Sequence, residues 1–187
     1  MAEKRKNWNG FMSGFKASDL VFLDESGCNT DMTRRYAYSL GGSRAVDSAP
    51  LSKPKNTTIL SSIQLDGTLH YTTFSGGTTV ERFKRYLETD LLPHLNGNSV
   101  LIMDNMKSHH AKAVKNLLDS SGIRYIYLPP YSPDLNPIEK LWSKVKSFLR
   151  KFKARTLDAL PNAIQNAFHS VTVSDCSGWF RFCGYAL

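Results

Sequence analysis

A proline-rich connection at residues 127–142 constrains the fold of this chain more than any other stretch, because it joins a strand to a helix through a rigid loop. An apolar strand pattern over residues 123–128 must stop at Pro129 and Pro130, since proline lacks the N–H that a central strand needs and restricts the residue before it. A loop of fixed shape must therefore carry the chain from this strand to the next element.

The residues after this loop predict a helix. Apolar side chains recur at helical spacing over residues 138–152, Asn136 occupies the N-cap position, and Pro137 fits the first helical position. The helix should open at Asn136 and carry Glu139 in its first turn. Glu139 could reach back to the amide of Asn136 as a capping box, or it could be a functional carboxylate, and this segment alone leaves both interpretations open.

Length and composition favour one soluble domain. The 187 residues are 41% apolar, enough to bury a substantial core. No apolar run approaches the roughly 20 residues of a membrane span, and the charged N-terminus lacks the apolar core of a signal peptide, so we expect a cytoplasmic protein without a membrane partner. Three cysteines without a CxxC pair argue against a disulfide framework or a structural zinc site.

Positive charge is concentrated on the predicted helix. Of the formal net charge of +8, an excess of +7 falls in residues 140–155, which hold no acidic residue but seven basic ones, namely Lys140, Lys144, Lys146, Arg150, Lys151, Lys153 and Arg155. At roughly 100° per residue, Lys146, Arg150 and Lys153 lie within about 40° of Glu139 around the helix axis. Such a stripe is either a solvated face or the electrostatic footprint of a polyanion site.

Two short apolar runs end in aspartate. Residues 20–23 predict a strand that ends at Asp24, at the mouth of a turn over residues 24–27, and residues 100–103 repeat the pattern and end in Asp104. Asp24 alone could be an ordinary turn residue. If the two strands are parallel neighbours, however, their carboxyl ends bring Asp24 and Asp104 side by side at the edge where such sheets place their active sites.

The other patterns complete an α/β fold. Further strands are predicted over residues 36–40, 57–65 and 69–74, the last two joined by an Asp-Gly turn. Thr78 and Glu81 form a capping-box pattern before a helix, and two more helices are predicted over residues 111–118 and 156–171. The aromatic tail beyond Ser174 should pack onto the body. Antiparallel strands early and crossover units late describe a mixed sheet covered by helices.

Two basic segments are expected to be loosely held. Residues 1–18 show little apolar patterning and should form an arm, partly disordered until it docks, that precedes the main domain of residues 19–187. Residues 43–56 combine two prolines with Arg44, Lys53 and Lys55 and should form a mobile loop, which could touch a phosphate backbone or simply remain solvated.

The three carboxylates suggest a metal site. If Asp24, Asp104 and Glu139 converge, their mutual repulsion calls for a positive partner, and oxygen ligands alone select Mg²⁺, with Mn²⁺ able to substitute. Two such ions about 3.5 to 4 Å apart could brace the oxygens of an in-line phosphoryl displacement. Glu25 is a weaker candidate, because adjacent side chains on an extended segment point to opposite faces.

Several neighbours are candidates for supporting roles near these acids. His109 could contact a phosphate or water near the metals, or could instead be the entry residue of the following helix. Asn105 and Asn136 are further near-site candidates. The candidate residues for binding a polyanion are Lys140, Lys144, Lys146, Arg150, Lys153 and Arg44.

These segments resemble bacterial insertion-sequence transposases of the Tc/mariner superfamily. The resemblance is carried by VFLDESG around Asp24, by IMDN followed by His109 around Asp104, and by YLPPYSPDLNPIE ending at Glu139. Between Asp104 and Glu139 lie 139 − 104 − 1 = 34 residues, the spacing typical of this family with glutamate as third acid. The similarity runs from about residue 19 almost to the C-terminus.

The resemblance implies a DDE endonuclease catalytic domain over residues 19–187, with a ribonuclease H-like fold built on a mixed five-stranded sheet. It implies Mg²⁺-dependent cleavage of transposon ends, joining of the freed 3′-hydroxyl to target DNA at TA dinucleotides, and action as a homodimer on double-stranded DNA at the bacterial nucleoid. The acidic triad would be Asp24, Asp104 and Glu139, which hold the metals.

The N-terminal part departs from the family pattern. Members usually carry helix-turn-helix modules that read the transposon ends, whereas only 18 residues precede the first strand here. An upstream reading frame could encode that half. The chain could accordingly be a competent transposase domain, a non-catalytic DNA-binding remnant that inhibits intact transposase, or, more weakly supported, a structure-selective nuclease.

Overall fold

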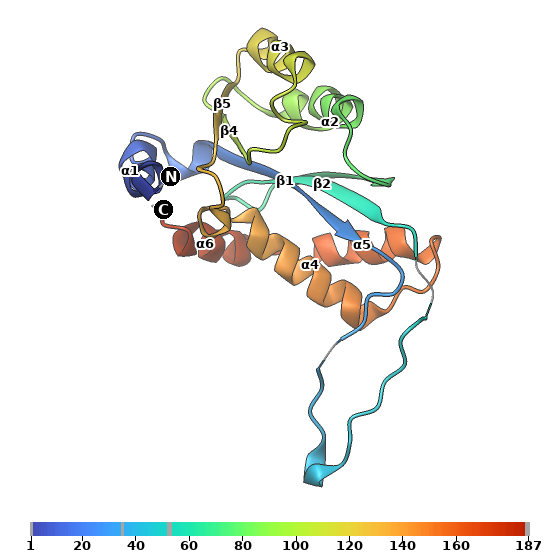
Figure 1. Ribbon diagram of the computed structural model, residues 1–187. Helices are drawn as coiled ribbons and strands as arrows, with labels where there is room; N and C mark the ends of the chain where they lie inside the picture. The colour runs from blue at the N-terminus through green and yellow to red at the C-terminus, as the bar shows by residue number, and fades with distance from the viewer. Residues whose placement is uncertain (1, 35, 52–53, 186–187) are drawn as a thin grey trace.

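A mixed sheet of five strands, with helices on both faces, forms the body of the protein (Figure 1). The computed structural model describes residues 2–34, 36–51 and 54–185, while residues 1, 35, 52–53 and 186–187 lie outside the described part. The strands follow the order β3-β2-β1-β4-β5, as the resemblance implies. Their bounds are β1 Leu20–Cys28, β2 Thr57–Ile63, β3 Leu69–Ser75, β4 Val100–Met103 and β5 Arg124–Tyr127.

Strand β1 changes its set of partners at the level of the first aspartate. It pairs in parallel with β4 as far as Leu23, opposite Met103, and it pairs antiparallel with β2 from Phe22 to Cys28. The predicted parallel neighbours are thus confirmed, and Asp24 and Asp104 follow directly after the last parallel pair. The predicted strand end at Asp24 is wrong, because β2 continues to supply hydrogen-bond partners and keeps residues 24–28 extended.

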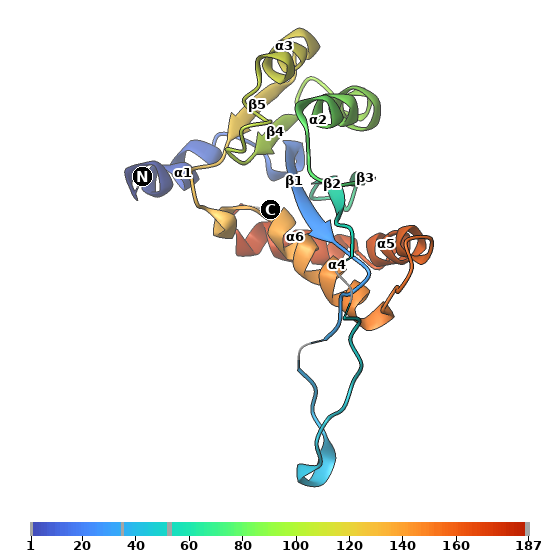
Figure 2. The same ribbon diagram turned by 45° about the vertical axis from the view of Figure 1, so that its right-hand side comes forward.

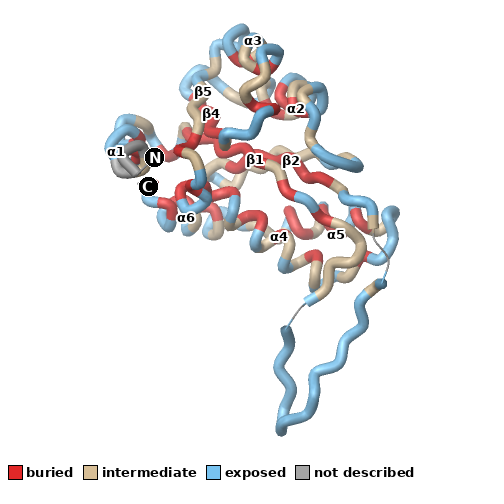
Figure 3. The backbone as a smooth tube through the Cα atoms, viewed as in Figure 1, coloured by how far each residue is buried: buried red, intermediate tan, exposed pale blue. Residues whose placement is uncertain are grey.

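Alternation along β1 and β4 divides the interior into two apolar layers (Figure 3). Leu20 and Phe22 pack with helices α1, α4, α5 and α6 on one face, whereas Val21 and Leu23 pack with α2 and α3 on the other. The helices are α1 Ala2–Met12, α2 Val80–Tyr86, α3 Lys112–Ser121, α4 Ile138–Phe152, α5 Ala159–His169 and α6 Val173–Phe182. Successive side chains along one strand therefore pack into different apolar layers.

The N-terminal arm is ordered and docked. Residues 2–12 form helix α1, which the sequence analysis did not predict, and the buried side chains of Trp8 and Met12 anchor this docked arm in the core. The indole Nε1–H of Trp8 donates to the hydroxyl of Tyr185 at 3.0 Å, and that hydroxyl donates to the carbonyl of Leu135 at 2.6 Å. The aromatic tail packs on the body, as predicted, through α6 and Tyr185.

Two smaller expectations are wrong. Residues 36–40 form no strand, since they lie in an exposed excursion that leaves the sheet after β1 and returns at β2. The N-cap of α2 is Thr79, whose hydroxyl accepts a hydrogen bond from the amide of Arg82, so the capping residue lies one position after Thr78. Helix α2 then runs into a π-helical turn, Leu87–Leu91, before the chain turns toward β4.

The excursion between β1 and β2 protrudes from the body (Figures 1 and 2). Its far end carries the short 3-10 turn Leu40–Gly42, with Arg44 exposed just beyond. Its base is tied to the C-terminal end of α4, because Lys153 pairs with Asp47 and the guanidinium of Arg155 donates to the carbonyl of Thr30. Lys53, named above as a basic loop residue, lies outside the described residues.

Across the described ranges, 2–34, 36–51 and 54–185, we find no helix with the length and apolar character needed to cross a membrane.

Candidate active site

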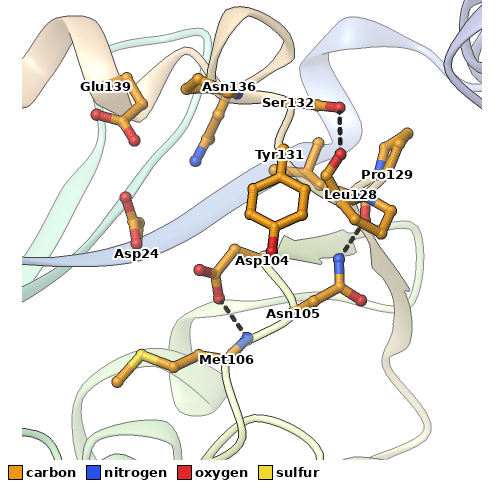
Figure 4. Close-up of a pocket in the computed structure, with 12 residues that line it drawn as sticks. Asp24, Asp104, Asn105, Met106, Leu128, Pro129, Tyr131, Ser132, Asn136 and Glu139 are labelled. Atoms are coloured by element: carbon orange, nitrogen blue, oxygen red, sulfur yellow. Dashed lines mark hydrogen bonds between the residues drawn. The ribbon is translucent and has the colours of Figure 1, made fainter. Parts of the chain in front are cut away.

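Three carboxylates from three elements line one cleft of about 400 Å³ (Figure 4). Asp24 comes from the middle of β1, Asp104 follows the end of β4, and Glu139 lies in the first turn of α4. The opposite wall is the loop between β5 and α4, which includes Pro129 and Tyr131. The structure thus brings together the three acids that the sequence proposed, and it also brings Asn105 and Asn136 to the same cleft.

Asp24 is the most perturbed of these acids. Only 8% of the residue is exposed, and the indole Nε1–H of Trp142 donates to its Oδ2 at 3.1 Å. Burial, together with the negative charges of Asp104 and Glu139, raises the pKa of the Asp24 carboxyl to about 7. The negative charge of Asp24 is therefore unfavourable in this structure. A bound cation would stabilise it.

Asp104 is held from behind by a buried histidine. His109 is fully buried, and its Nδ1 lies 2.8 Å from Oδ1 of Asp104. Its Nε2 lies 3.2 Å from Oε2 of Glu25, an ion-pair distance whose geometry is not that of a hydrogen bond. Burial alone would lower the pKa of the imidazole, but the contacts with Asp104 and Glu25 outweigh burial and raise the pKa of His109 to about 9. His109 is therefore buried behind Asp104, with its two ring nitrogens facing Asp104 and Glu25.

Glu25 lies on the other face of β1 from Asp24, as strand alternation predicts. It reaches the layer of α2 and α3, where the ring of His109 stacks on Phe83 at 4.2 Å between centroids. The His109 contacts were missed at the sequence level, although the five-residue spacing from Asp104 pointed to proximity. They lower the pKa of Asp104, against the opposing effect of its partial burial.

The capping-box interpretation of Glu139 is not supported. No side-chain hydrogen bond caps α4, and Oδ1 of Asn136 is buried without a partner among the described residues. The predicted N-cap at Asn136 is wrong, because Pro137 has helical backbone angles and is itself the N-cap of α4, which begins at Ile138. Glu139 is instead exposed to the cleft, so the structural role that competed with a chemical one is absent.

The chemical type of the oxygen ligands in the cleft suits a hard divalent cation. Asp24, Asp104 and Glu139 offer carboxylate oxygens only, which suit Mg²⁺ and Mn²⁺ rather than zinc. Within residues 2–34, 36–51 and 54–185, no trio of His, Cys, Asp or Glu side chains is already gathered closely enough to hold an ion. Binding an ion would thus require the three carboxylates to come closer together than they lie in this structure.

The basic residues of α4 divide between two faces. Lys146 and Arg150 line a polar hollow of about 400 Å³ beside the C-terminal end of β1, on the side of the helix that carries Glu139. Lys144 pairs with Asp175 of α6 at 2.5 Å, and the ammonium of Lys140 lies 3.9 Å from the ring centre of Phe182. Lys153 ends the helix in a left-handed conformation and is paired with Asp47.

The loop opposite the acids is braced by the N-terminal helix. The guanidinium of Arg5 donates to the carbonyl of Tyr131 and to Oγ of Ser132, both at 2.9 Å, and pairs with Asp134 at 2.7 Å. The side-chain amide of Asn105 donates to the carbonyl of Leu128 at 2.5 Å. These contacts join the ends of β4 and β5 to the loop. No pattern in the sequence predicted them.

Comparison with known proteins gives the family. Residues 19–161 match the family described as DDE superfamily endonuclease. The chain belongs to this family. This DDE endonuclease domain is also 28% identical, over 97 residues, to the transposase of the transposable element Tc1 of Caenorhabditis elegans, a match that covers 50% of this chain and 36% of that protein.

Solved structures share the fold of this DDE endonuclease domain. The mariner Mos1 paired-end complex with Mn gives a TM-score of 0.80 at 21% identity and covers 97% of this chain and 61% of that chain. The Mos1 transposase catalytic domain with Raltegravir and Mg gives a TM-score of 0.73 at 18% identity, and the match covers 97% of this chain and 89% of that chain. The expected ribonuclease H-like fold is confirmed. The match to the Tc1 transposase spans only about a third of that relative's length.

Proposed function

We propose that this chain is the catalytic domain of a DNA transposase, which cleaves transposon ends and joins the freed 3′-hydroxyl to target DNA at TA dinucleotides. The observation that carries the proposal is the convergence of Asp24, Asp104 and Glu139 on one cleft in a chain of the DDE family. The Mos1 relatives, solved with Mg and with Mn, support a divalent metal, and the paired-end complex supports double-stranded DNA as the partner.

In this proposal Asp24, Asp104 and Glu139 hold the metal. When bound, two divalent ions supply the positive charge that activates a hydroxyl and stabilises the leaving oxygen in phosphoryl transfer. Trp142 fixes the orientation of Asp24 through its indole N–H, while His109 fixes Asp104 through Nδ1. The cleft walls then position the phosphodiester in line, which is the main contribution of a protein to this chemistry.

The DNA backbone would run from the cleft along one face of α4. Lys146 and Arg150 share the side of the helix that carries Glu139, and their hollow lies beside the same central strand that carries Asp24. Lys140, Lys144 and Lys153 already contact Phe182, Asp175 and Asp47, so we assign them a smaller share of phosphate binding. Arg44, at the far end of the protruding segment, could meet DNA only away from the cleft.

The test is Mg²⁺- or Mn²⁺-dependent strand cleavage by the variants Asp24→Asn, Asp104→Asn and Glu139→Gln. Each should lose cleavage while retaining the fold and most of the DNA affinity. Glu139→Gln is the sharpest, because the carboxylate makes no capping contact and its loss should leave the melting temperature unchanged. Glu88→Gln, which removes a surface carboxylate paired with Lys84 on the opposite side of the sheet, is the matched control.

One outcome would favour the alternative function. A wild-type chain that binds DNA but cleaves none, with either metal, would be a DNA-binding remnant that can inhibit intact transposase. Mixing it with an active relative and following cleavage would then measure the inhibition.

We further propose that two copies act together on DNA at the nucleoid, with an upstream-encoded helix-turn-helix half to read the ends. Support for pairing comes from the paired-end Mos1 complex and from the protruding segment, where Tyr38 and Leu51 are fully exposed apolar side chains. Light scattering of the chain with and without DNA, repeated for Tyr38→Asp, tests whether this segment holds two copies together.

A further inference from the structure

A buried carboxylate lies behind the sheet, on the face turned away from the cleft. Glu25 follows Asp24 on β1 and pairs with Leu60 of β2, so its side chain points into the apolar layer of α2 and α3. Only 12% of this side chain is exposed, and both carboxylate oxygens are buried with no hydrogen-bond partner among the described residues. A charged group in such a place is costly, so its presence calls for an explanation.

The carboxylate of Glu25 faces a fully buried histidine. Its Oε2 lies 3.2 Å from Nε2 of His109, and Nδ1 of the same ring lies 2.8 Å from Oδ1 of Asp104. An imidazole that meets a carboxylate at each nitrogen cannot rotate without losing both contacts. The ring of His109 therefore joins a carboxylate behind the sheet to an acid that lines the cleft.

Other contacts fix the place of this ring but not the direction of its nitrogens. Phe83 of α2 stacks on it with the centroids 4.2 Å apart, and the hydroxyl of Tyr127 donates to the carbonyl of His109 at 2.9 Å. A half-turn of the ring about χ2 would keep both contacts and exchange its nitrogens for carbons. The carboxylates of Glu25 and Asp104 distinguish the two orientations. Glu25 is the fixed end, because it lies within β1, whereas Asp104 follows the end of β4 with 45% of its side chain exposed.

We propose that Glu25 is a positioning residue for the reaction, which acts on Asp104 through His109. This inference rests on the proposed function, in which Asp104 holds the metal. Oδ1 of Asp104 faces His109 and also accepts the amide of Met106 at 3.0 Å, so among the described residues Oδ2 is the oxygen left for a cation. Successive residues of β1 would then support two metal ligands, since Asp24 is itself a ligand and Glu25 orients the other from behind the sheet.

The experiment is a calorimetric titration of the metal-free chain with Mn²⁺. Glu25→Gln keeps the size of the side chain and removes its charge, and it should weaken Mn²⁺ binding by about 10-fold, the lower end of the range for partners that support a metal ligand. Glu25→Leu should show a similar loss. Its apolar side chain of similar size suits the surrounding layer, so this variant should fold even if a neutral amide does not.

A double-mutant cycle separates positioning from general damage to the fold. If Glu25 acts through His109, then Glu25→Gln should change Mn²⁺ affinity no further in a chain that already carries His109→Gln. Asp19→Asn, which removes a carboxylate just before the other end of β1, is the matched control and should leave the affinity unchanged. Wild-type affinity in both Glu25 variants would overturn the proposal, and so would losses that simply add in the double variant.

The same preparations are assayed for metal-dependent cleavage, which separates this inference from the proposed function. A wild-type chain that binds no Mn²⁺ and cleaves nothing would remove both. A wild-type chain that binds Mn²⁺ and cleaves, beside a Glu25→Gln variant that binds equally well, would leave the proposed function standing and remove only the positioning role.

Discussion

The Asp24 carboxyl carries an electrostatic cost, because burial and the neighbouring carboxylates disfavour its charged form. It lies beneath α4 with two other carboxylates on the same cleft, and its one side-chain hydrogen bond comes from Trp142. A protein selected for stability alone would place an apolar residue or an amide there. At the residue scale, this cost is consistent with the proposed metal site, because a bound cation would offset it.

This cost predicts a pH-dependent stability difference. The folded-state pKa of Asp24 is raised from 3.8 to about 7. The protonated carboxyl therefore contributes to the free energy of unfolding in full below pH 3.8, and this contribution is lost as the pH rises through 7. Asp24→Asn removes that loss. In the absence of divalent metal the variant should be about 2 to 4 kcal/mol more stable than the parent at pH 8, and the two should converge near pH 4.

Chemical denaturation at the two pH values measures the difference. Adding Mg²⁺ at pH 8 should stabilise the parent and not Asp24→Asn, because only the parent gains from binding. Parallel pH profiles for the two proteins would contradict this account.

His109 should act through Asp104 and not on the substrate. His109→Gln removes the charged partner that orients the carboxylate, and loss of such a supporting contact typically costs about 10- to 100-fold in metal affinity. Calorimetric titration with Mn²⁺ reads the affinity directly. His94→Gln is the control, since His94 stacks on His70 and does not line the cleft of the acids. An unchanged Mn²⁺ affinity would leave His109 with a packing role only.

At the scale of elements, α4 has two basic faces with different neighbours. The face of Lys146 and Arg150 continues from Glu139, while the face of Lys140 and Lys144 is occupied by α6. Helix α4 therefore carries Glu139 at the cleft. Its basic face beside Glu139 would determine the direction in which a bound polyanion extends away from the cleft.

The two faces should differ in their salt dependence. Lys146→Ala and Arg150→Ala should each weaken binding to unrelated duplexes and reduce the slope of log affinity against log salt by about one, as expected for one lost phosphate contact. Lys140→Ala and Lys144→Ala are matched controls on the same helix and should change the slope little. Fluorescence anisotropy over a series of salt concentrations gives the slopes, and equal slopes for all four variants would mean that the helix has no preferred DNA face.

The sequence predicted those helices and strands that are specified by apolar periodicity and by proline or glycine at their ends. The parallel neighbours at Asp24 and Asp104 follow from apolar runs, and the helix that carries Glu139 follows from apolar spacing after the prolines. What failed depended on long-range contacts. Strand β1 continues beyond Asp24 because β2 pairs with it. Helix α1, residues 2–12, docks on the body because Trp8 donates a hydrogen bond to Tyr185, which is 177 positions away in the sequence.

The supporting contacts of the site could not be predicted for the same reason. The sequence proposed three acids by their spacing, but it gave no sign that Trp142 donates to Asp24 or that Arg5 braces the loop of Tyr131. Each of these pairs joins residues more than 100 positions apart, and a single sequence contains no pattern that links them.

At the scale of the whole molecule, the described residues form one fold of the DDE endonuclease family, and its proposed DNA contacts are basic side chains, which would position DNA without reading bases. The 187-residue chain should therefore bind transposon ends hardly better than scrambled duplex. Fusion to an upstream-encoded helix-turn-helix region should add discrimination of about 10³-fold or more. Competition titrations of both proteins at one salt concentration make the comparison, and a strong preference by the short chain would show that its own loops read bases.

The contact between α1 and Tyr185 also has a topological consequence. The N-terminal helix and the C-terminal segment meet through Trp8 and Tyr185, and both ends of the chain lie on the same side of the body in Figure 1. Proteins with neighbouring ends often accept circular permutation. A permuted chain that joins the present ends by a short linker and opens in the exposed turn Leu40–Gly42 should therefore keep its sheet intact. Such a chain would move the attachment point of any fused domain from the edge of the catalytic cleft to the tip of the protruding segment.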